Sequence, residues 1–179
     1  MIKEKLIEAL EKHTITKLVI FDMDNTLVKT PGREECDKVW MEKFNKPWPH
    51  KGVFSKPESL DFTIFEIQTI ASVIKEYEAI KNDSFIYKVL LTGRLYKLAK
   101  EVKKLLDHHN LFFDEYLLNN RGETLNFKLF ELNRLSKEFP NLKEILFFDD
   151  RDEHMPHFIE LGKKIEEELN IKFVMIHVE

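Results

Sequence analysis

The sequence predicts an α/β protein of the doubly wound, Rossmann-like type, in which a mostly parallel sheet carries helices on both faces. Short apolar runs rich in β-branched and aromatic residues alternate along the chain with longer segments whose apolar residues have helical spacing. Two of the apolar runs, at 18–21 and 145–148, lead directly into aspartates. Continuous apolar runs are typical of strands that are buried on both faces. Because the segments between these strands are long enough for helices, we expect right-handed crossovers and parallel strands.

The first half of the chain contains three predicted helices and two predicted strands. A charged segment with a helical apolar stripe predicts a helix at 2–12, and the apolar run that ends at Asp22 predicts a strand at 17–21. We expect a short helix at 36–44 and a longer one at 61–80, where apolar residues recur three and four apart up to Asn82-Asp83-Ser84. The next apolar run predicts a strand at 85–91, which is closed by Thr92-Gly93-Arg94.

The second half repeats the alternation of helix and strand. Helical spacing of apolar residues predicts helices at 95–108, 127–139 and 157–169. The apolar runs between and after them predict strands at 113–118, 144–148 and 173–176. The strand at 144–148 runs into Asp149 and Asp150 and so mirrors the strand that precedes Asp22.

One segment interrupts this pattern and predicts a small insert at about 29–60. It contains four of the six prolines, two glycines and both tryptophans, Trp40 and Trp48. Such a composition is typical of irregular structure. We expect residues 1–179 to form a single domain with this insert lying over the sheet edge as a small cap. The tryptophans either pack the insert onto the core or contact a substrate.

Composition limits the other possibilities. A chain of 179 residues with 43% hydrophobic content suits one domain with a sizeable core. Its one cysteine, Cys36, excludes an internal disulfide and a CxxC metal pair, so we expect a reducing, cytoplasmic compartment. The first residues lack the apolar core of a signal peptide, and no run approaches the length of a membrane span. The net charge of −4 gives no overall attraction for nucleic acid or membranes.

Four polar features lie at corresponding places in the predicted fold. Asp22 and Asp24 follow the first strand, Thr92 follows the second, Lys128 begins a helix, and Asp149-Asp150 follows a later strand. Taken singly, each fits a turn or a solvated surface. Taken together, the four features do not fit a turn or a solvated surface, because four acids that converge at strand ends repel one another without a cation. Ligation by oxygen atoms, with room for phosphate, favours Mg²⁺.

The same set resembles the signature of the haloacid dehalogenase (HAD) superfamily of phosphatases and phosphotransferases. The superfamily's first motif, aspartate-x-aspartate-x-threonine, matches Asp22-Met23-Asp24-Asn25-Thr26 in its strand context. Thr92 matches the second motif, Lys128 the third, and Asp149 and Asp150 the fourth. Short matches in the insert and in the segment 149–154 further resemble the HAD domains of "Swiss army knife" RNA-repair proteins.

This resemblance implies a mechanism with specific roles. Asp22 would attack phosphorus and form an aspartyl-phosphate, while Asp24 would protonate the leaving oxygen and then deprotonate water. Thr92 and the following N–H would hold phosphoryl oxygens, and Lys128 would balance charge. The implied Mg²⁺ ligands are Asp22, Asp24 through its carbonyl, and Asp150 with Asp149 close behind. The expected substrate contacts are Asn25, Gly93, Arg94 and Trp48, with Arg94 alternatively pairing on the surface.

Several functions remain open at this point. We expect a Mg²⁺-dependent phosphomonoesterase with either a nucleic-acid terminus, a nucleotide or another small molecule as its phosphorylated substrate. The segment 29–56 carries seven basic and four acidic residues, a net +3, interleaved with aromatic residues, which favours a polynucleotide end. A phosphotransferase such as a mutase is one alternative, and a non-catalytic phosphate-binding module is another. The sequence leaves the oligomeric state open.

Overall fold

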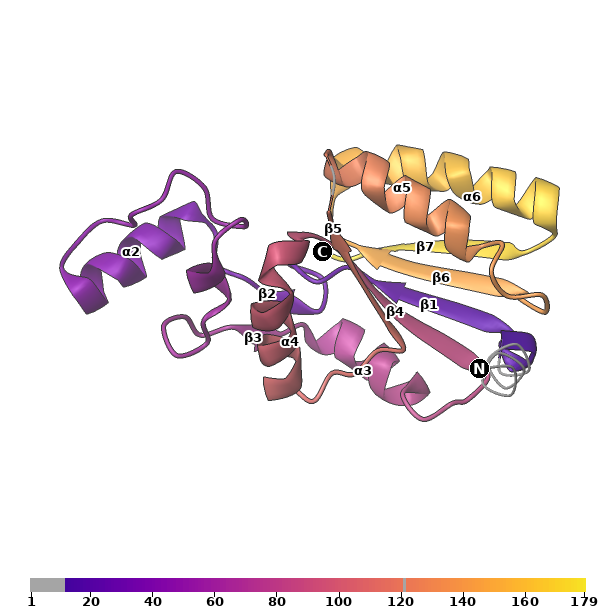
Figure 1. Cartoon of the computed structure of the whole chain (residues 1–179), viewed down its shortest axis with the longest axis horizontal. Helices are drawn as coiled ribbons and strands as arrows, with labels where there is room; N and C mark the ends of the chain where they lie inside the picture. The colour runs from indigo at the N-terminus through magenta and orange to yellow at the C-terminus, as the bar shows by residue number, and fades with distance from the viewer. Residues whose placement is uncertain (1–11, 121) are drawn as a thin grey trace.

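The computed structural model describes residues 12–120 and 122–179 and contains a five-stranded parallel sheet (Figure 1). The order of the strands is β5-β4-β1-β6-β7, so β1 lies at the centre. Their bounds are β1 Lys17–Phe21, β4 Ile86–Leu95, β5 Glu115–Asn119, β6 Glu144–Asp149 and β7 Lys172–His177. The α/β, Rossmann-like fold class that the sequence predicts is confirmed.

Helices cover both faces of this sheet. Figure 1 shows α5 and α6 on one face and α3 and α4 on the other, with α2 set apart from both pairs. Their bounds are α2 Arg33–Phe44, α3 Ala71–Ile80, α4 Ala99–His108, α5 Thr124–Leu135 and α6 Met155–Leu169. The described residues also form three short 3-10 turns, η1 Pro57–Leu60, η2 Tyr96–Leu98 and η3 Asp152–His154. A small antiparallel pair of strands consists of β2 Val28–Lys29 and β3 Gln68–Thr69. No helix in the described part of the chain is long and apolar enough to cross a membrane.

The alternation of side chains along β1 supplies two hydrophobic cores. Leu18 and Ile20 belong to the core shared with α5 and α6, whereas Val19 and Phe21 belong to the core shared with α3 and α4. All four are almost fully buried. Because successive residues of a strand point to opposite faces, a continuous apolar run is what a strand with helices on both sides requires.

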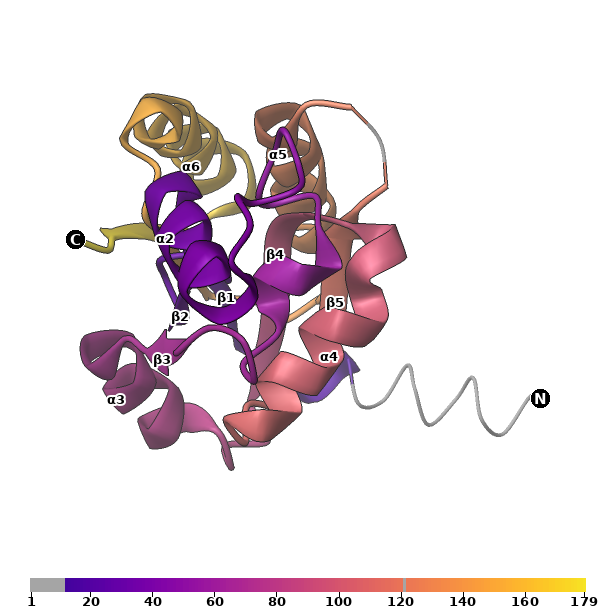
Figure 2. The same ribbon diagram turned by 90° about the vertical axis from the view of Figure 1, so that its left-hand side faces the viewer.

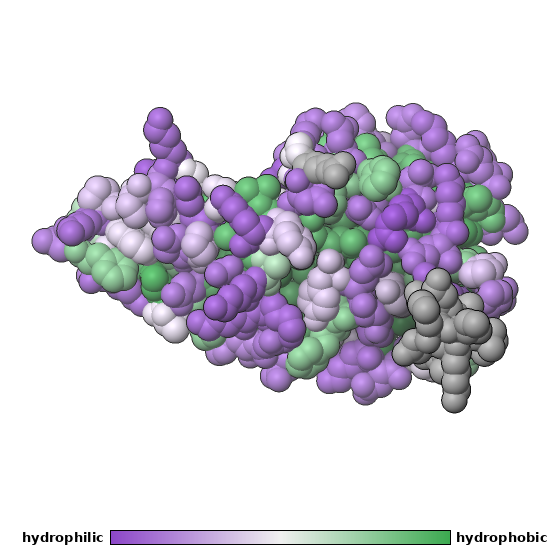
Figure 3. All heavy atoms as spheres, viewed as in Figure 1, coloured by the Kyte–Doolittle hydropathy of each residue, from purple (hydrophilic) through white to green (hydrophobic). Residues whose placement is uncertain are grey.

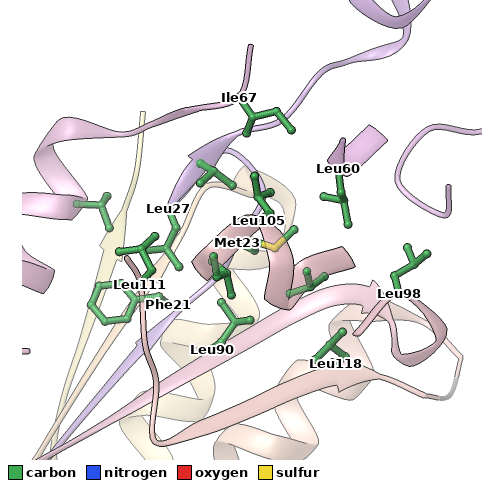
Figure 4. Close-up of a cluster of buried hydrophobic side chains, with 14 of the residues drawn as sticks. Phe21, Met23, Leu27, Leu60, Ile67, Leu90, Leu98, Leu105, Leu111 and Leu118 are labelled. Carbon is green, nitrogen blue, oxygen red and sulfur yellow. The ribbon is translucent and has the colours of Figure 1, made fainter. Parts of the chain in front are cut away.

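The insert, residues 29–60, is anchored in the second of these cores. Figure 4 shows Leu60 of the insert in the same cluster as Phe21, Leu90 and Leu105. The rest of the insert extends past the carboxyl ends of the strands, so that α2 lies in front of the sheet in Figure 2. Figure 3 shows the surface hollowed between the lobe that carries α2 and the body under α5. The insert therefore lies over the sheet edge at which the polar motifs end.

The helix predicted at 61–80 is wrong in its first half, since α3 begins only at Ala71. The carboxylate of Asp61 accepts hydrogen bonds from both the N–H and the hydroxyl of Thr63, which is a turn that competes with a helix. Further along, β3 pairs with β2, and the N–H of Ile70 donates to the carbonyl of Leu27. These long-range pairings override the helical spacing of the apolar residues.

Other boundaries also differ from the prediction. The strand predicted at 85–91 continues to Leu95, so Thr92-Gly93-Arg94 lies within β4 and does not end the strand. The register between β4 and β5 shifts at this point, between Thr92 and Leu95. The helix predicted at 95–108 begins as a 3-10 turn, and the helix predicted at 127–139 runs from Thr124 to Leu135. The small β2-β3 pair was not expected. The helix predicted at 2–12 lies outside the described residues except for its last position.

Candidate active site

The polar motifs meet at a cavity of about 130 Å³ beyond the carboxyl ends of β1, β4 and β6. In open α/β sheets this edge is where ligands bind. Residues from all of these strands and from α5 and the insert line it: Asp22, Asp24, Asn25, Phe54, Gly93, Arg94, Thr124, Lys128, Asp150 and Arg151. The residues that the sequence predicts for the site lie along this cavity, apart from Thr92, Trp48 and Asp149.

The turn after β1 brings the two aspartates of the first motif to the cavity. The N–H of Asp22 continues the sheet by donating to the carbonyl of Phe148 on β6. The carbonyl of Met23 then accepts hydrogen bonds from three successive N–H groups, of residues 26–28, which folds the chain back tightly. Asn25 has a φ of 54°, a left-handed conformation that asparagine tolerates better than most residues.

A buried lysine lies between two of the carboxylates. The Nζ atom of Lys128 is 2.6 Å from Oδ2 of Asp149 and 2.9 Å from Oδ1 of Asp22. All three side chains are nearly inaccessible to solvent. Burial opposes the charged form of Lys128, but Asp22 and Asp149 outweigh it and raise the pKa of the lysine. Lys128 is therefore a fixed positive charge at the floor of the cavity.

The protonation of Asp22 depends strongly on its surroundings. Its pKa is raised from 3.8 to about 7, mainly by burial and also by the charges of Asp149 and Asp24, while Lys128 opposes the rise. The pKa of Asp150 is also raised, first by burial and then by Asp149. A pocket that disfavours ionised carboxylates in this way is typical of functional sites and is relieved by a bound cation.

The carboxylates fit a divalent cation. Asp22, Asp149 and Asp150 each offer one oxygen atom, and these atoms lie within 4.8 Å of one another. Among the described residues, Oδ1 of Asp22 is buried without a well-aligned hydrogen bond, despite the nearby Lys128, so it retains capacity for a ligand. Asp149 instead uses Oδ2 for Lys128 and Oδ1 for the N–H of Arg151. The half-buried Asp150 lines the cavity, which favours Asp22 and Asp150 as direct ligands.

Arg94 and Asp24 form an ion pair that the sequence did not specify. Arg94 is 2% exposed, so the alternative of a surface pair is wrong. Its Nε atom lies 2.9 Å from Oδ2 of Asp24, and its Nη2 atom lies 2.7 Å from Oδ1. The Nη1 atom of Arg94 donates to the carbonyl of Phe54 and to the hydroxyl of Ser59, both in the insert. The side chain of Asp24 lies outside the carboxylate cluster, so Asp24 would reach a metal only through its carbonyl.

The second motif presents its backbone rather than its hydroxyl to the cavity. The Thr92 hydroxyl is fully buried and accepts the N–H of Arg94, and Thr92 does not line the cavity. Gly93 does, beside Thr124 at the start of α5. A Cβ atom on Gly93 would lie 2.7 Å from Cγ2 of Thr124, so only glycine fits this approach. Thr124 was missed, although a threonine at a helix start was a usable signal.

The prediction that Trp48 contacts the substrate is wrong. Trp48 is 3% exposed, its indole N–H donates to the carbonyl of Gly52, and its ring packs against Phe65. The alternative, that the tryptophan packs the insert, is the one observed. Among the described residues of the insert, Phe54 lines the cavity, and this residue is 43% exposed. Arg151, which follows Asp150 in the sequence, was also missed as a residue that lines the cavity.

Solved structures of other proteins share this fold. A chain of the Pnkp1/Rnl/Hen1 complex is 16% identical with a TM-score of 0.53, over 91% of this chain and 46% of that one. The haloacid dehalogenase-like protein SP0104 from Streptococcus pneumoniae is 16% identical with a TM-score of 0.51, over 90% and 94%. The HAD hydrolase t0658 from Salmonella enterica serovar Typhi is 14% identical with a TM-score of 0.53, over 92% and 68%. The chain thus spans under half of the matched chain in the Pnkp1/Rnl/Hen1 complex.

Residues 63–179 match the family described as "HAD domain family 1 in Swiss Army Knife RNA repair proteins". The match covers more than half of the chain, and the chain belongs to this family. The family is one of HAD domains, and the solved structures with the same fold include proteins described as HAD hydrolases. No curated protein matches the sequence of this chain. The matched region begins after the insert and so does not include Asp22 and Asp24.

Proposed function

We propose that the protein is a Mg²⁺-dependent phosphomonoesterase with Asp22 as its nucleophile. One observation carries this proposal: Asp22 lies at the floor of the cavity beside a buried lysine and forms a carboxylate cluster with Asp149 and Asp150. A carboxylate that attacks phosphorus needs a positive charge beside it and a cation to offset its repulsion from the phosphate. Lys128 provides the positive charge, and the carboxylate cluster can hold the cation.

The remaining side chains support a two-step reaction. Asp22 attacks the phosphorus atom, the bond to the leaving oxygen breaks, and Asp24 gives that oxygen a proton. Asp24 then takes a proton from the water that hydrolyses the aspartyl-phosphate. Lys128 balances the charge of Asp22 throughout, and the backbone at Gly93 with Thr124 orients the phosphoryl oxygens. Mg²⁺ held by Asp22, Asp150 and the carbonyl of Asp24 would supply electrostatic stabilisation of the phosphoryl group.

Activity on an aryl phosphate tests the proposal directly. We expect hydrolysis that requires added Mg²⁺, stops with EDTA, and falls about 10³-fold or more in Asp22→Asn, since this substitution removes the nucleophile. Exposed Asp83→Asn is a matched control that leaves the site intact. Wild-type activity in Asp22→Asn would refute the mechanism. Tight phosphate binding without turnover in the wild type would instead support a non-catalytic binding module, and transfer to an added alcohol in preference to water would support a phosphotransferase.

We further propose a nucleic-acid terminus as the substrate, with a nucleotide or another small phosphate ester as the alternative. The family's description as a domain of RNA-repair proteins supports this, as does the net charge of +3 on residues 29–56. At the cavity itself the exposed ring of Phe54 and the exposed Arg151 are suitably placed for a base and a neighbouring phosphodiester. Stacking on an aromatic ring contributes about 1–3 kcal/mol per base.

A substrate panel separates these possibilities. Oligonucleotides with 3′- or 5′-phosphates, mononucleotides and sugar phosphates are compared by kcat/KM. If a polynucleotide end is the substrate, Lys43, Lys46 and Lys51 changed together to Ala should weaken activity on oligonucleotides more than on an aryl phosphate, and more at low salt. Arg151→Ala should do the same. Equal losses on both substrates would exclude the insert as a polynucleotide-binding surface.

A further inference from the structure

Both ends of the insert meet at one carboxylate, that of Asp24. At the start of the insert, the hydroxyl of Thr30 donates to Oδ1 of Asp24 at 2.7 Å. At its end, the carbonyl of Phe54 and the hydroxyl of Ser59 each accept a hydrogen bond from Nη1 of Arg94 at 2.7 Å. Arg94 in turn holds both oxygens of Asp24. The insert is thus joined to Asp24 directly and through a guanidinium group.

The hydroxyl of Ser59 is fixed in the role of an acceptor. Ser59 is fully buried, and its hydroxyl donates its single hydrogen to the carbonyl of Lys56 at 2.7 Å. Only its lone pairs remain for Arg94. The guanidinium group is planar, so two acceptors on Nη1 also fix the direction of the Nε and Nη2 donors that hold Asp24. The guanidinium carbon of Arg94 lies over the Phe54 ring, 5.0 Å from its centroid.

These contacts leave one oxygen of Asp24 less engaged than the other. Oδ1 accepts hydrogen bonds from Thr30 and from Nε and Nη2 of Arg94, whereas Oδ2 accepts one, from Nε. Among the described residues, Oδ2 is therefore the oxygen with more room for a further hydrogen bond. Neither Thr30 nor Ser59 lines the cavity, so neither can act on a substrate there directly.

We propose that the insert positions the proton-transfer group of the reaction, with Thr30 and Ser59 as positioning residues and Arg94 as the link to Asp24. The proposal rests on the proposed function, in which Asp24 protonates the leaving oxygen. A proton-transfer group must lie within hydrogen-bond reach of that oxygen, and a displacement of about 1 Å costs on the order of 10²-fold in rate. The insert thereby shapes the cavity mouth and also fixes the geometry of proton transfer.

The choice of leaving group provides the test. Dinitrophenolate leaves without a proton, whereas the alkoxide of glycerol phosphate requires one. The constant kcat/KM reports the steps up to phosphoryl transfer to Asp22, so later hydrolysis of the aspartyl-phosphate does not obscure it. For Thr30→Val and Ser59→Ala we expect kcat/KM to fall about tenfold or more on glycerol phosphate and less than about twofold on 2,4-dinitrophenyl phosphate. Ser59→Thr, which keeps the hydroxyl, should retain most of the activity.

The matched control is Ser136→Ala. Ser136 is also a buried serine whose hydroxyl donates to a carbonyl, that of Asn133, but it follows α5 and has no bond to Asp24. This variant should affect both substrates equally or not at all. Equal losses on the two substrates in Thr30→Val or Ser59→Ala, or no loss in either, would overturn the proposal. An active Asp22→Asn would overturn the proposed function itself, so the two failures are distinguishable.

Discussion

The ammonium group of Lys128 and the carboxylate of Asp149 form an ion pair at 2.6 Å with almost no exposure to solvent. The same ammonium group lies 2.9 Å from Asp22. Removing one partner of a buried pair leaves the other charge uncompensated, which costs far more than the loss of a surface pair. Lys128 therefore contributes both to the stability of the fold and to the chemistry proposed for the cavity.

Lys128→Met should weaken both properties. We expect the free energy of unfolding to fall by about 3–5 kcal/mol, because Asp149 stays buried without its cation. Activity of the folded fraction should fall about 10²-fold or more, because Asp22 and the phosphate lose a stabilising charge. Urea unfolding and aryl phosphate hydrolysis measure the two effects.

Lys172→Met is the control for that substitution. Lys172 pairs with Glu144 at 2.6 Å, but its side chain is mostly exposed. A surface pair of this kind contributes about 1 kcal/mol or less. A loss of stability in Lys128→Met as small as that in Lys172→Met would contradict the buried ion pair.

The raised pKa of Asp22 predicts that the ionised carboxylate of Asp22 destabilises the metal-free protein. With a folded-state pKa of about 7 against 3.8 in the unfolded chain, the unfolded state binds fewer protons between these values. Stability attributable to Asp22 therefore falls as pH rises from about 4 to 7. In EDTA, Asp22→Asn should be more stable than the wild type by on the order of 4 kcal/mol at pH 8 and by little at pH 4. Urea titrations at both pH values measure this, and a gain that does not depend on pH would contradict it.

Substitutions at two glycines, Gly93 and Gly162, should distinguish an effect on activity from an effect on stability. A Cβ atom on Gly93 would lie 2.7 Å from Thr124 at the cavity, so Gly93→Ala should reduce activity at least tenfold. A Cβ atom on Gly162 would lie 2.3 Å from the Phe173 ring, between α6 and β7, so Gly162→Ala should lower stability by about 1–3 kcal/mol. The folded Gly162→Ala protein should keep near-normal activity. Thermal melts and phosphatase assays on both variants check this, and the reverse pattern would show that the two contacts are misassigned.

Much of the fold and site could be predicted because local pattern and burial agree there. The central strand is an apolar run with aspartates at its end, and a strand buried on both faces admits few other interpretations. The four motifs converge because parallel strands end at one edge of the sheet. The helices α4, α5 and α6 were predicted for the same reason, apart from shifts of a few residues at their ends, whereas only the second half of the helix predicted at 61–80 is helical.

The errors lie where long-range contacts decide the structure. Residues 61–70 have helical spacing but pair with Leu27 and β2 or turn through Asp61, which no local pattern shows. The burial of Trp48 and the role of Arg94 depend on how the insert folds back onto the sheet. The sequence could place Arg94 at a strand end but not identify Asp24 and Ser59 as its partners.

Mg²⁺ binding should identify which fourth-motif acid is the direct ligand. Asp150 lines the cavity, whereas both oxygens of Asp149 already accept hydrogen bonds from Lys128 and Arg151. A cation that binds only the folded state at about 100 times its Kd adds about 2.7 kcal/mol of stability, which corresponds to a rise in Tm of roughly 5–10 °C for a chain of this size. Asp150→Asn should abolish most of this rise while leaving the melting of the metal-free protein near that of the wild type. Asp152→Asn, at an exposed position two residues further on, should keep the full rise.

Asp149→Asn should instead lower the Tm of the metal-free protein, since Lys128 loses its shortest ion pair. A Mg²⁺-dependent rise that survives in Asp150→Asn but disappears in Asp149→Asn would assign the direct contact to Asp149.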